Sequence, residues 1–522
     1  MNDAVWVEGD DRPLQTIARN IATRYALVGV EMIIGLLTLP FNLHHLGPQA
    51  YGLLTLTAGI TVHFSILDLG YGGAMVKFVA QYRAHRDARA LNEVASTIFV
   101  IFSCFGVIAY LVVMALAFNI EHVFKLTPAQ VTTGRWILLI VGLNVAVNFA
   151  FAVYGGICVG FQRLDRNNVV AVCSAVAVAL ANVIVLLLGY GLIGLVTATT
   201  SVRMVTYLVY RHNAYRVFPM LRVSLALFRR DRLREVTGFS IYASMIDWAN
   251  KLNYELDELV IGVLMGSAPV AIWAVADRVI SGTQRLTNQG NAVLFPVVVD
   301  SDVTGRESRL QTLLLEGTRL SLATVIPVAV VLIVLADAFV RAWVGPAMAG
   351  AAPVIQILAF AVALRVGTAT STTLLKGAGQ VRYLAFVNLT IGVVNLVLSA
   401  LLIKPLGLIG VAIGTLVPIA AGSMFVIFPA ACRRIDVPVA RAFRQAVWPA
   451  VWPAAVVGFA LFVSRRVTPA GLATVLVEAA AAALLYLALF VVALGPVDRA
   501  HYAARLRELA ERKRKVAHLK TA

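Results

Sequence analysis

Fourteen apolar stretches of helical length run through the chain, and short polar segments separate them. A helix needs about 20 apolar residues to cross the hydrocarbon core of a bilayer, and each stretch is of that order. The pattern predicts an all-α integral membrane protein with about fourteen transmembrane helices. The stretches lie near residues 21–43, 49–76, 93–117, 135–160, 169–189, 191–210, 236–264, 268–298, 311–335, 352–375, 384–403, 407–430, 445–463 and 470–494.

Lysine and arginine gather in every second gap between these stretches. The basic gaps lie near 77–89, 163–166, 211–234, 306–309, 376–382 and 433–444, and the C-terminal tail continues the pattern. The gaps on the other side hold only Lys125, Arg135, Arg341, Lys404, Arg465 and Arg466. Because cytoplasmic loops carry the excess of basic residues, the first side is predicted to be cytoplasmic, with both termini on it.

Composition agrees with a membrane protein. Hydrophobic residues make up 60% and charged residues 14%, with a mean hydropathy of +0.83. The net charge of +17 follows mostly from loops that face an anionic leaflet, so nucleic acid is not an expected partner. The four cysteines lie in or beside spans, without a CxxC motif or a histidine cluster, so no metal and no cofactor is expected. Residues 1–18 lack the apolar core of a signal peptide, and the first span is expected to act as its own insertion signal.

A repeat of about 216 residues indicates the architecture. Its first copy is Gly-Phe-Gln-Arg at 160–163, a helix containing Asn182, and Gly-Leu-Ile-Gly at 191–194. Its second copy is Gly-Gln-Val-Arg at 379–382, a helix containing Asn395, and Gly-Leu-Ile-Gly at 407–410. A fainter match, between residues 46–52 and 265–271, has nearly the same separation as the two copies of the repeat. Six spans separate the copies, so both halves are predicted to enter the membrane in the same direction.

The repeat predicts two pseudo-symmetric lobes of six helices and two appended C-terminal helices. The basic segment between the lobes mixes arginines with Val217, Phe218, Leu221, Leu225 and Phe228, which indicates an interfacial amphipathic helix. The expected divisions are a cytoplasmic N-terminal tail (1–20), an N-lobe (21–210), the amphipathic linker (211–235), a C-lobe (236–430), spans thirteen and fourteen (431–494), and a basic cytoplasmic tail (495–522).

Ionisable side chains lie at bilayer depth in the first two spans of each predicted lobe. Such groups are costly in a membrane unless they face one another or a wet cavity, so they mark candidate functional sites. The seventh span carries a stripe in which Asp247–Lys251 and Lys251–Glu255 are spaced to form ion pairs. The candidates for binding an anionic group are Arg24, Lys251, Arg278, Arg285, Arg319 and Arg365. The candidates for charge balance or proton coupling are Glu31, Asp68, Asp247, Glu255 and Asp277.

These stripes favour a hydrated cavity between the lobes, because so many polar faces need something to contact. The alternative is that the charges form buried ion pairs that lock the helices together. Arginine favours an anionic cargo, since its planar guanidinium can hold a phosphate with two hydrogen bonds.

Residues 46–81 read LGPQAYGLLTLTAGITVHFSILDLGYGGAMVKFVAQ. This stretch resembles the N-terminal pattern of the polysaccharide-transporter (Wzx-type) oligosaccharide flippases, and residues 375–415 resemble the same family. The pattern consists of Leu46, Gly47, Tyr51, Gly52, Asp68, Leu69 and Gly70. The resemblance implies a MATE-like fold that moves a polyprenyl-diphosphate-linked glycan to the outer leaflet by alternating access. Related lipid II flippases have arginines in the first and eighth spans. The resemblance implies that Arg24, and Arg278 or Arg285, occupy comparable places in this chain.

The sequence is therefore interpreted as a flippase of the bacterial inner membrane, not an enzyme, with a lipid-linked oligosaccharide as its cargo. A polysaccharide polymerase or another biosynthesis protein is a candidate protein partner. Two alternatives stay open: a cation-coupled drug or metabolite antiporter of the same fold, and a membrane glycan polymerase or ligase. The first would need an acidic, aromatic-rich cavity, and the second would need catalytic groups on long outward loops.

Overall fold

The computed structural model describes residues 13–124, 126–237, 256–287, 298, 301–302, 304–468 and 471–494. Every regular element in these ranges is a helix. The predicted site residues Asp247, Lys251 and Glu255 lie outside the described residues. The chain divides into two compact units, Met1–Val279 with Ala385–Thr415, and Ile280–Leu384 with Leu416–Ala522. The lobe boundaries expected from the repeat remain a prediction.

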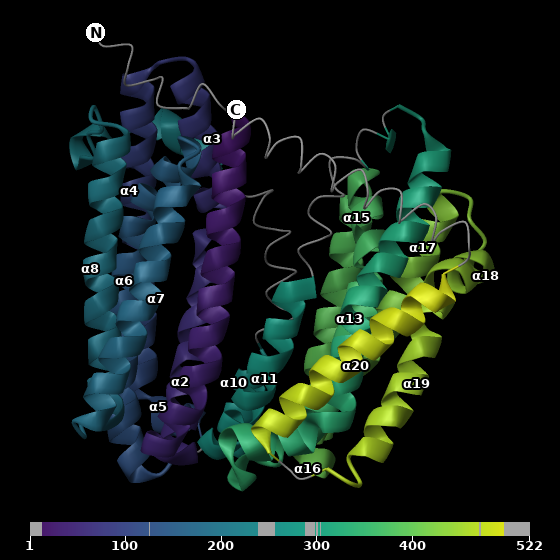
Figure 1. The fold of residues 1–522 in the computed structure, drawn as a ribbon. Coiled ribbons are helices and arrows are strands. Elements are labelled where there is room, and N and C mark those ends of the chain that lie inside the picture. The colour runs from purple at the N-terminus through teal and green to yellow at the C-terminus, as the bar shows by residue number, and fades with distance from the viewer. Residues whose placement is uncertain are drawn as a thin grey trace, which may run out of the picture. The chain divides into compact units, whose positions relative to one another are not determined.

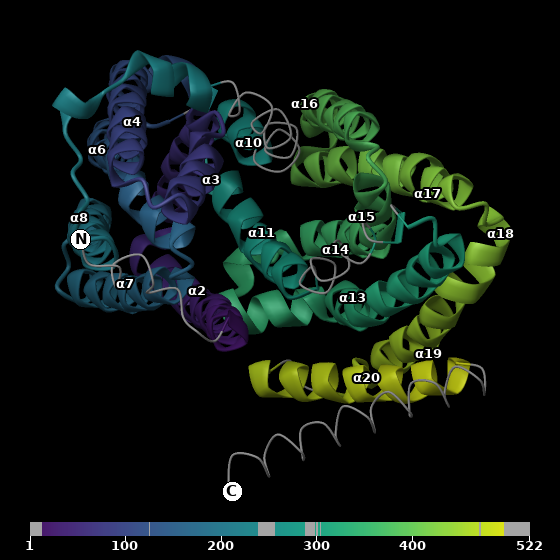
Figure 2. The same ribbon diagram turned by 90° about the horizontal axis from the view of Figure 1, so that it is seen from above.

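The first unit is built around α4 and α6, which pack along each other, with α8 against α6 and α7 against both α2 and α8 (Figures 1 and 2). A single 3-10 turn, η1 (Phe64–Asp68), connects α2 to α3. The helices that begin in this unit are α2 (Pro13–His63), α3 (Tyr71–Ala84), α4 (Ala88–Phe118), α5 (Ile120–Val123), α6 (Pro128–Gly160), α7 (Leu164–Leu187), α8 (Gly191–Val217), α10 (Asp257–Met265) and α11 (Ser267–Thr287), and most of α16 (Val381–Ala421) belongs to it as well.

The second unit is organised by one long helix, α13, which packs against α14, α15, α19 and α20 (Figure 1). Pro327 lies inside α13, at a point where neighbouring helices bury it. The helices of this unit are α13 (Glu307–Val344), α14 (Ala351–Gly367), α15 (Ala369–Gly377), α17 (Phe428–Arg434), α18 (Val439–Ala442), α19 (Trp448–Ser464) and α20 (Leu472–Ala493), with π-helical turns before α17 and α19.

Ten helical segments among the described residues are long and apolar enough to cross a membrane. Two of them contain a backbone break, at Gly47 (φ 75°) in α2 and at Gly407 (φ 60°) in α16, so each of these helices covers parts of two predicted spans. The protein is an all-helical, multi-pass membrane protein, as the hydrophobic pattern predicted.

The internal repeat is visible in the backbone and in its hydrogen bonds. Gly191 and Gly407 open the repeated Gly-Leu-Ile-Gly segments with the same φ of 60°. Thr199 donates a hydrogen bond to Asn182 over 2.8 Å, and Thr415 lies within hydrogen-bond distance of Asn395, at 3.3 Å. The fainter match is also supported, because Gly47 and Gly266 both have positive φ angles, 75° and 92°. Only glycine adopts such angles readily, which explains its presence at each junction.

Small residues bring the helices of the first unit close together. A Cβ atom on Gly106 would lie 2.5 Å from the carbonyl oxygen of Ala146, so α4 and α6 meet backbone to backbone at this point. On α6, a Cβ on Gly156 would lie 2.8 Å from Met75, and one on Gly160 would lie 2.5 Å from Val79. Close approach through glycine is typical of helices packed in a membrane, where dispersion contacts replace the hydrophobic driving force.

The predicted interfacial helix over 211–235 is not continuous in the structure. Helix α8 ends at Val217, residues 218–229 form a largely extended strap with short turns at 219–220 and at Leu225–Leu227, and residues 230–237 are helical again. Val217, Phe218 and Leu221 are almost fully buried in the core formed with α3, α4 and α6. The first part of the amphipathic pattern therefore reflects burial against protein, which requires the same apolar spacing as burial in lipid, whereas Leu225 is exposed.

Side chains of α4 hold this strap by satisfying its backbone. Asn92 donates to the carbonyl of Met220 and accepts from the amide of Arg222, each over 2.9 Å. Ser96 accepts from the amide of Ser224 over 3.1 Å. Outside its short turns the strap makes no backbone hydrogen bonds with itself, so these side chains replace the partners that a helix would have supplied.

An ion-pair network closes the end of the strap. Arg232 donates to Glu235 over 3.0 Å, to Tyr82 over 2.7 Å and to Glu93 over 3.4 Å. The Glu93 residue is 9% exposed, and such a carboxylate requires cationic partners. Burial and the hydrogen bond to Glu235 raise the pKa of Tyr82 to about 12, so its hydroxyl stays neutral at physiological pH.

We predict that Asn92→Ala loosens the strap, because it leaves the Met220 carbonyl and the Arg222 amide without partners in a buried environment. The expected loss of unfolding free energy is about 1–3 kcal/mol. Hydrogen exchange should be faster at residues 220–224 in the variant. Asn119→Ala is the control, since Asn119 is exposed and its side chain bonds the Ala115 carbonyl of its own helix. Unchanged exchange at 220–224 would contradict the role given to Asn92.

Candidate functional site

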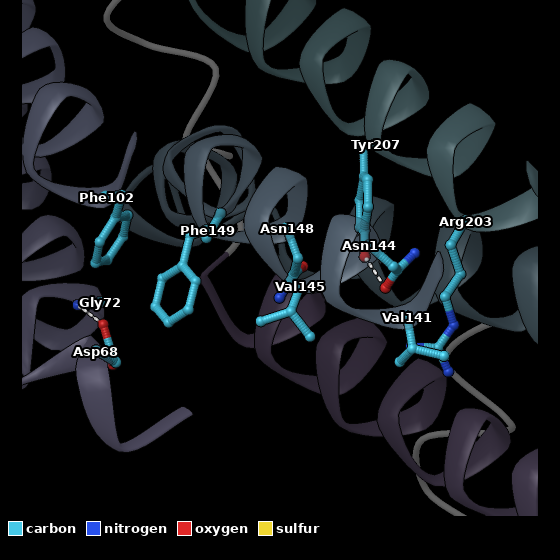
Figure 3. A pocket seen from close by; sticks show the side chains of 11 residues that line it. Asp68, Gly72, Phe102, Val141, Asn144, Val145, Asn148, Phe149, Arg203 and Tyr207 are labelled. Atoms are coloured by element: carbon cyan, nitrogen blue, oxygen red, sulfur yellow. Dashed lines mark hydrogen bonds between the residues drawn. The ribbon is translucent and has the colours of Figure 1, made fainter. Parts of the chain in front are cut away.

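A cavity of about 410 Å³ lies within the first unit, among η1, α3, α4, α6 and α8 (Figure 3). Its volume falls in the range of about 300–1000 Å³ that is typical of small-molecule sites. We call it the α4–α6–α8 pocket. Its lining combines polar and aromatic side chains: Asp68, Gly72, Phe102, Val141, Asn144, Val145, Asn148, Phe149, Ala152, Arg203 and Tyr207.

Four polar side chains gather at one end of this pocket. Tyr207 of α8 donates its hydroxyl proton to Oδ1 of Asn144 on α6 over 3.2 Å. This bond orients the amide, and Nδ2 of Asn144 is buried without a hydrogen-bond partner in a residue that is only 6% exposed. Asn148, one helical turn further along α6, and Arg203, one turn before Tyr207, are exposed and also line the pocket.

Asp68 lies at the other end, where the chain turns from η1 into α3. Its carboxylate accepts a hydrogen bond from the amide of Gly72 over 2.9 Å. The turn itself uses positive φ angles at Leu69 (48°) and Gly70 (77°). A carboxylate is favourable at a helix N-terminus because the first amides of the helix have no internal acceptor. The structure thus places the predicted candidate Asp68 in the α4–α6–α8 pocket.

Arg278 of α11 lies against α2, because Gly35 of α2 leaves space for its guanidinium. A side chain on Gly35 would overlap the guanidinium of Arg278, so this position must remain without a Cβ for the arginine to lie there. Glu31 precedes Gly35 by one helical turn and is half-buried, and Asp277 is also half-buried. The first and eighth predicted spans therefore meet at Arg278, and the cavity expected between the lobes remains a prediction.

Two of the predicted cargo arginines have no carboxylate within ion-pair distance in the part of the chain that the structure describes. They are Arg24 on α2 and Arg278 on α11, and both are exposed. Carboxylates do lie on these helices, yet Glu31 and Asp277 make other interactions. An unpaired guanidinium in a membrane helix is well suited to an anion, because no competing carboxylate must be displaced.

A buried cluster of oxygen atoms lies where α10 meets α16. Thr415 has one hydroxyl proton but three acceptors within reach: Oδ2 of Asp257 at 3.1 Å, Oδ1 of Asn395 at 3.3 Å and the Val411 carbonyl at 3.1 Å. Ser399 likewise lies 3.0 Å from Oδ1 of Asn395 and 3.4 Å from the Val411 carbonyl. Each hydroxyl has more than one acceptor within reach of its single proton, and Asp257 adds a buried carboxylate, so the cluster is a candidate site for a further proton or a small hard cation.

The remaining cationic candidates belong to the second unit. Arg319 on α13 is 7% exposed, Arg365 on α14 is half-buried, and Arg285 near the end of α11 is exposed. Each of the three makes an interaction with another residue. Near Arg319, the hydroxyls of Ser321 and Thr370 lie 3.3 Å apart and are both buried. These arginines remain candidates for the cargo site.

Several residues of these sites were not identified from the sequence. They are Arg203, Asn144, Asn148 and Tyr207 in the pocket, and Asp257, Asn395, Ser399 and Thr415 in the oxygen cluster. The signal for the first set was an arginine in the middle of the sixth span and an asparagine pair spaced four residues apart in the fourth. The sequence marked Asn395 only as part of the repeat. It did not show which of the adjacent acidic residues Asp257 and Glu258 lies on the helix face that contacts Asn395.

Comparisons with known proteins agree with this architecture. Over 418 residues the chain is 21% identical to "Probable flippase AglR" of Haloferax volcanii, and the aligned region covers 79% of this chain and 83% of that protein. Two solved structures share the fold. "Lipid II flippase MurJ, inward closed conformation" gives a TM-score of 0.68 at 14% identity, covering 91% of this chain and 98% of that one. A multidrug resistance MATE family transporter, in an inward-facing conformation, gives 0.63 at 17% identity, with 79% and 94% covered.

A family model described as "Polysaccharide biosynthesis protein" matches residues 45–351. The match covers more than half of the chain and extends from the Gly47 junction in α2 to the start of α14. This chain belongs to the polysaccharide biosynthesis protein family.

Proposed function

We propose that this protein flips a polyprenyl-diphosphate-linked oligosaccharide across the bacterial inner membrane by alternating access. The observation that carries the proposal is the position of Arg278, whose guanidinium lies against Gly35 without a carboxylate partner among the described residues. The family and the likeness to the flippase of Haloferax volcanii support it. The termini would lie in the cytoplasm, and a polysaccharide polymerase or another biosynthesis protein would act beside it.

The diphosphate of the proposed cargo is complementary to the cationic side chains of the predicted site. A diphosphate carries negative charge that must leave water to cross the bilayer, and paired hydrogen bonds from arginine compensate for that loss. Arg24 and Arg278 would hold the diphosphate, with Lys251, Arg285, Arg319 and Arg365 as further cationic groups. The lipid tail would remain in the hydrocarbon core throughout, so moving it between leaflets requires no transfer of apolar surface into water.

The alternatives fit less well. A cation-coupled drug antiporter of the same fold would be hindered by unpaired arginines, because its usual cargo is itself cationic. A membrane glycan polymerase or ligase needs catalytic groups on outward loops, and the loops joining α5 to α6 and α13 to α14 are short. Transport is therefore favoured over an enzymatic reaction.

Switching between conformations needs a group whose charge changes during the cycle. Glu31, Asp68, Asp247, Glu255 and Asp277 are candidates from their positions in the sequence. We add Asp257, because its carboxylate is buried and lies 3.1 Å from the hydroxyl of Thr415 on α16. Binding of a proton or a monovalent cation there would neutralise the carboxylate and couple the ion to the packing of α10 on α16.

We predict that Gly35→Ala reduces transport about tenfold while leaving the amount of folded protein unchanged. The added methyl group displaces the guanidinium of Arg278, and one hydrogen bond to a charged group corresponds to about that factor. The matched control is Gly29→Ala on the same helix, where a Cβ would have no neighbour within 4 Å. Alanine favours helix over glycine by about 0.5–1 kcal/mol, so neither variant should lose stability. Equal transport by both variants would show that the position of Arg278 is immaterial.

We also predict that Arg278→Ala combined with Arg285→Ala abolishes glycan export in cells while the protein remains in the membrane. The physical reason is the loss of two cationic donors from a diphosphate that has left water. The double variant Arg211→Ala with Arg216→Ala removes the same charge from the end of α8 and should export normally. Unchanged export by the first double variant would reject the assignment of these arginines to the cargo site.

A third prediction concerns coupling. Asp257→Asn removes the charge of the oxygen cluster while keeping its size, so transport into vesicles should lose its dependence on the coupling ion. Transport should be measured against a sodium gradient and, separately, a proton gradient, which identifies the ion. Asp337→Asn is the control, since Asp337 forms an exposed ion pair with Arg341. If the Asp257→Asn variant kept the full ion dependence of the wild type, the cluster would have no part in coupling.

A further inference from the structure

The α4–α6–α8 pocket is separate in the fold from the arginine at Gly35 and has a different chemistry. Its charged groups are one arginine, Arg203, and one carboxylate, Asp68, located at opposite ends (Figure 3). The two charges balance, so the pocket has no strong preference for an anion or a cation. A ligand with many hydroxyl groups, which can both donate and accept, suits such a lining better than an ion does.

The pocket offers hydrogen bonds that the protein itself does not use. Nδ2 of Asn144 is buried without a partner, and Tyr207 fixes the orientation of that amide by bonding its oxygen over 3.2 Å. Within the described residues Arg203 interacts with the side chain of Tyr207 but has no ion-pair partner, and the side chain of Asn148 makes no hydrogen bond. A buried amide donor is costly to leave unsatisfied, so its retention beside a cavity points to a ligand that accepts from it.

The middle of the pocket is aromatic. Phe149 of α6 lies between the polar end and Asp68, and Phe102 of α4 lies at the same end as Asp68 (Figure 3). The face of an aromatic ring carries partial negative charge, and it attracts the weakly positive C–H groups on the face of a sugar ring. Hydroxyl-bonding amides at one end and aromatic faces beside them are the two features that sugar recognition needs.

We propose that the α4–α6–α8 pocket binds one sugar ring of the oligosaccharide that the protein carries. The proposal rests on the function proposed above and specifies where the glycan, as distinct from the diphosphate, makes contact. Asn144 and Asn148 donate to ring hydroxyls, Phe102 and Phe149 contact the apolar face, and Arg203 pairs with a hydroxyl or, in an acidic sugar, with the carboxylate. The exposed positions of Asn148 and Arg203 place the mouth of the pocket at its polar end.

The test is direct binding of free sugars to the purified full-length protein in lipid nanodiscs, measured by saturation-transfer NMR. Glucose, N-acetylglucosamine and glucuronate are the probes, and their saturation is measured on wild type and variants. Asn148→Ala and Arg203→Gln change exposed side chains, so they should fold normally, and each should weaken binding about tenfold. Asn144→Leu should remove binding altogether. Arg211→Gln, two turns further along α8 and outside the pocket, is the matched control and should bind as wild type does.

Saturable binding of at least one probe, weakened by the pocket variants and not by Arg211→Gln, supports the proposal. Absence of saturable binding to the wild type, or equal binding by all variants, overturns it. Sodium binding that is lost in Asp68→Asn, without any sugar binding, also overturns it and assigns the pocket to an ion. A parallel vesicle assay with lipid-linked oligosaccharide separates the two claims. Flipping without pocket-dependent sugar binding leaves the proposed function intact, whereas a wild type that fails to flip rejects that function whatever the pocket binds.

Discussion

The constraint on which this structure depends is the absence of water in the hydrocarbon core. A polar group there must find a partner in the protein or face a wet space, because each unsatisfied group costs several kcal/mol. Several buried polar groups meet this constraint locally. Thr199 satisfies Asn182, and Ser464 and Thr468 donate to Oε1 of Glu478 at 2.8 and 2.7 Å, and the guanidinium of Arg465 lies 3.5 Å from its Oε2. Within the described residues the guanidinium groups of Arg24 and Arg278 have no carboxylate partner, and Nδ2 of Asn144 has no hydrogen-bond acceptor. These groups are therefore candidates for binding a ligand.

Glycine serves two different purposes in meeting this constraint. At Gly106 and Gly160 it lets helices approach until backbone and side chains are in contact, which strengthens packing where no hydrophobic effect acts between helices. At Gly35 it makes room for a charged side chain instead. The first purpose stabilises the bundle, and the second keeps a cation accessible on its surface. Both look alike in the sequence, since each is a glycine in an apolar helix.

The sequence determined the helical membrane fold, the repeat and its glycine junctions, because hydrophobic length and positive φ angles depend on local residues. It did not determine the strap, since Phe218 and Leu221 have a spacing that suits lipid and protein surfaces equally. It also missed the α4–α6–α8 pocket. Asn144, Arg203 and Asp68 come from three separate spans, and periodicity shows which face of a helix is polar but not which helices meet. Asp68 was singled out for its charge alone, and its neighbours became apparent only from the packing.

The duplicated halves have diverged at one informative position. Asn182 with Thr199 in the first copy matches Asn395 with Thr415 in the second. Nine residues before the junction glycines Gly47 and Gly266, however, the first copy has Thr38 and the second has Asp257. A threonine hydroxyl stays neutral at any physiological pH, whereas a buried carboxylate can take up a proton or a cation. The carboxylate of Asp257 is the one that Thr415 reaches, so the titratable group stands inside the repeated asparagine–threonine arrangement of the second copy alone. This asymmetry is why the proposed ion coupling is assigned to the second copy of the repeat, whereas the proposed sugar pocket lies in the first.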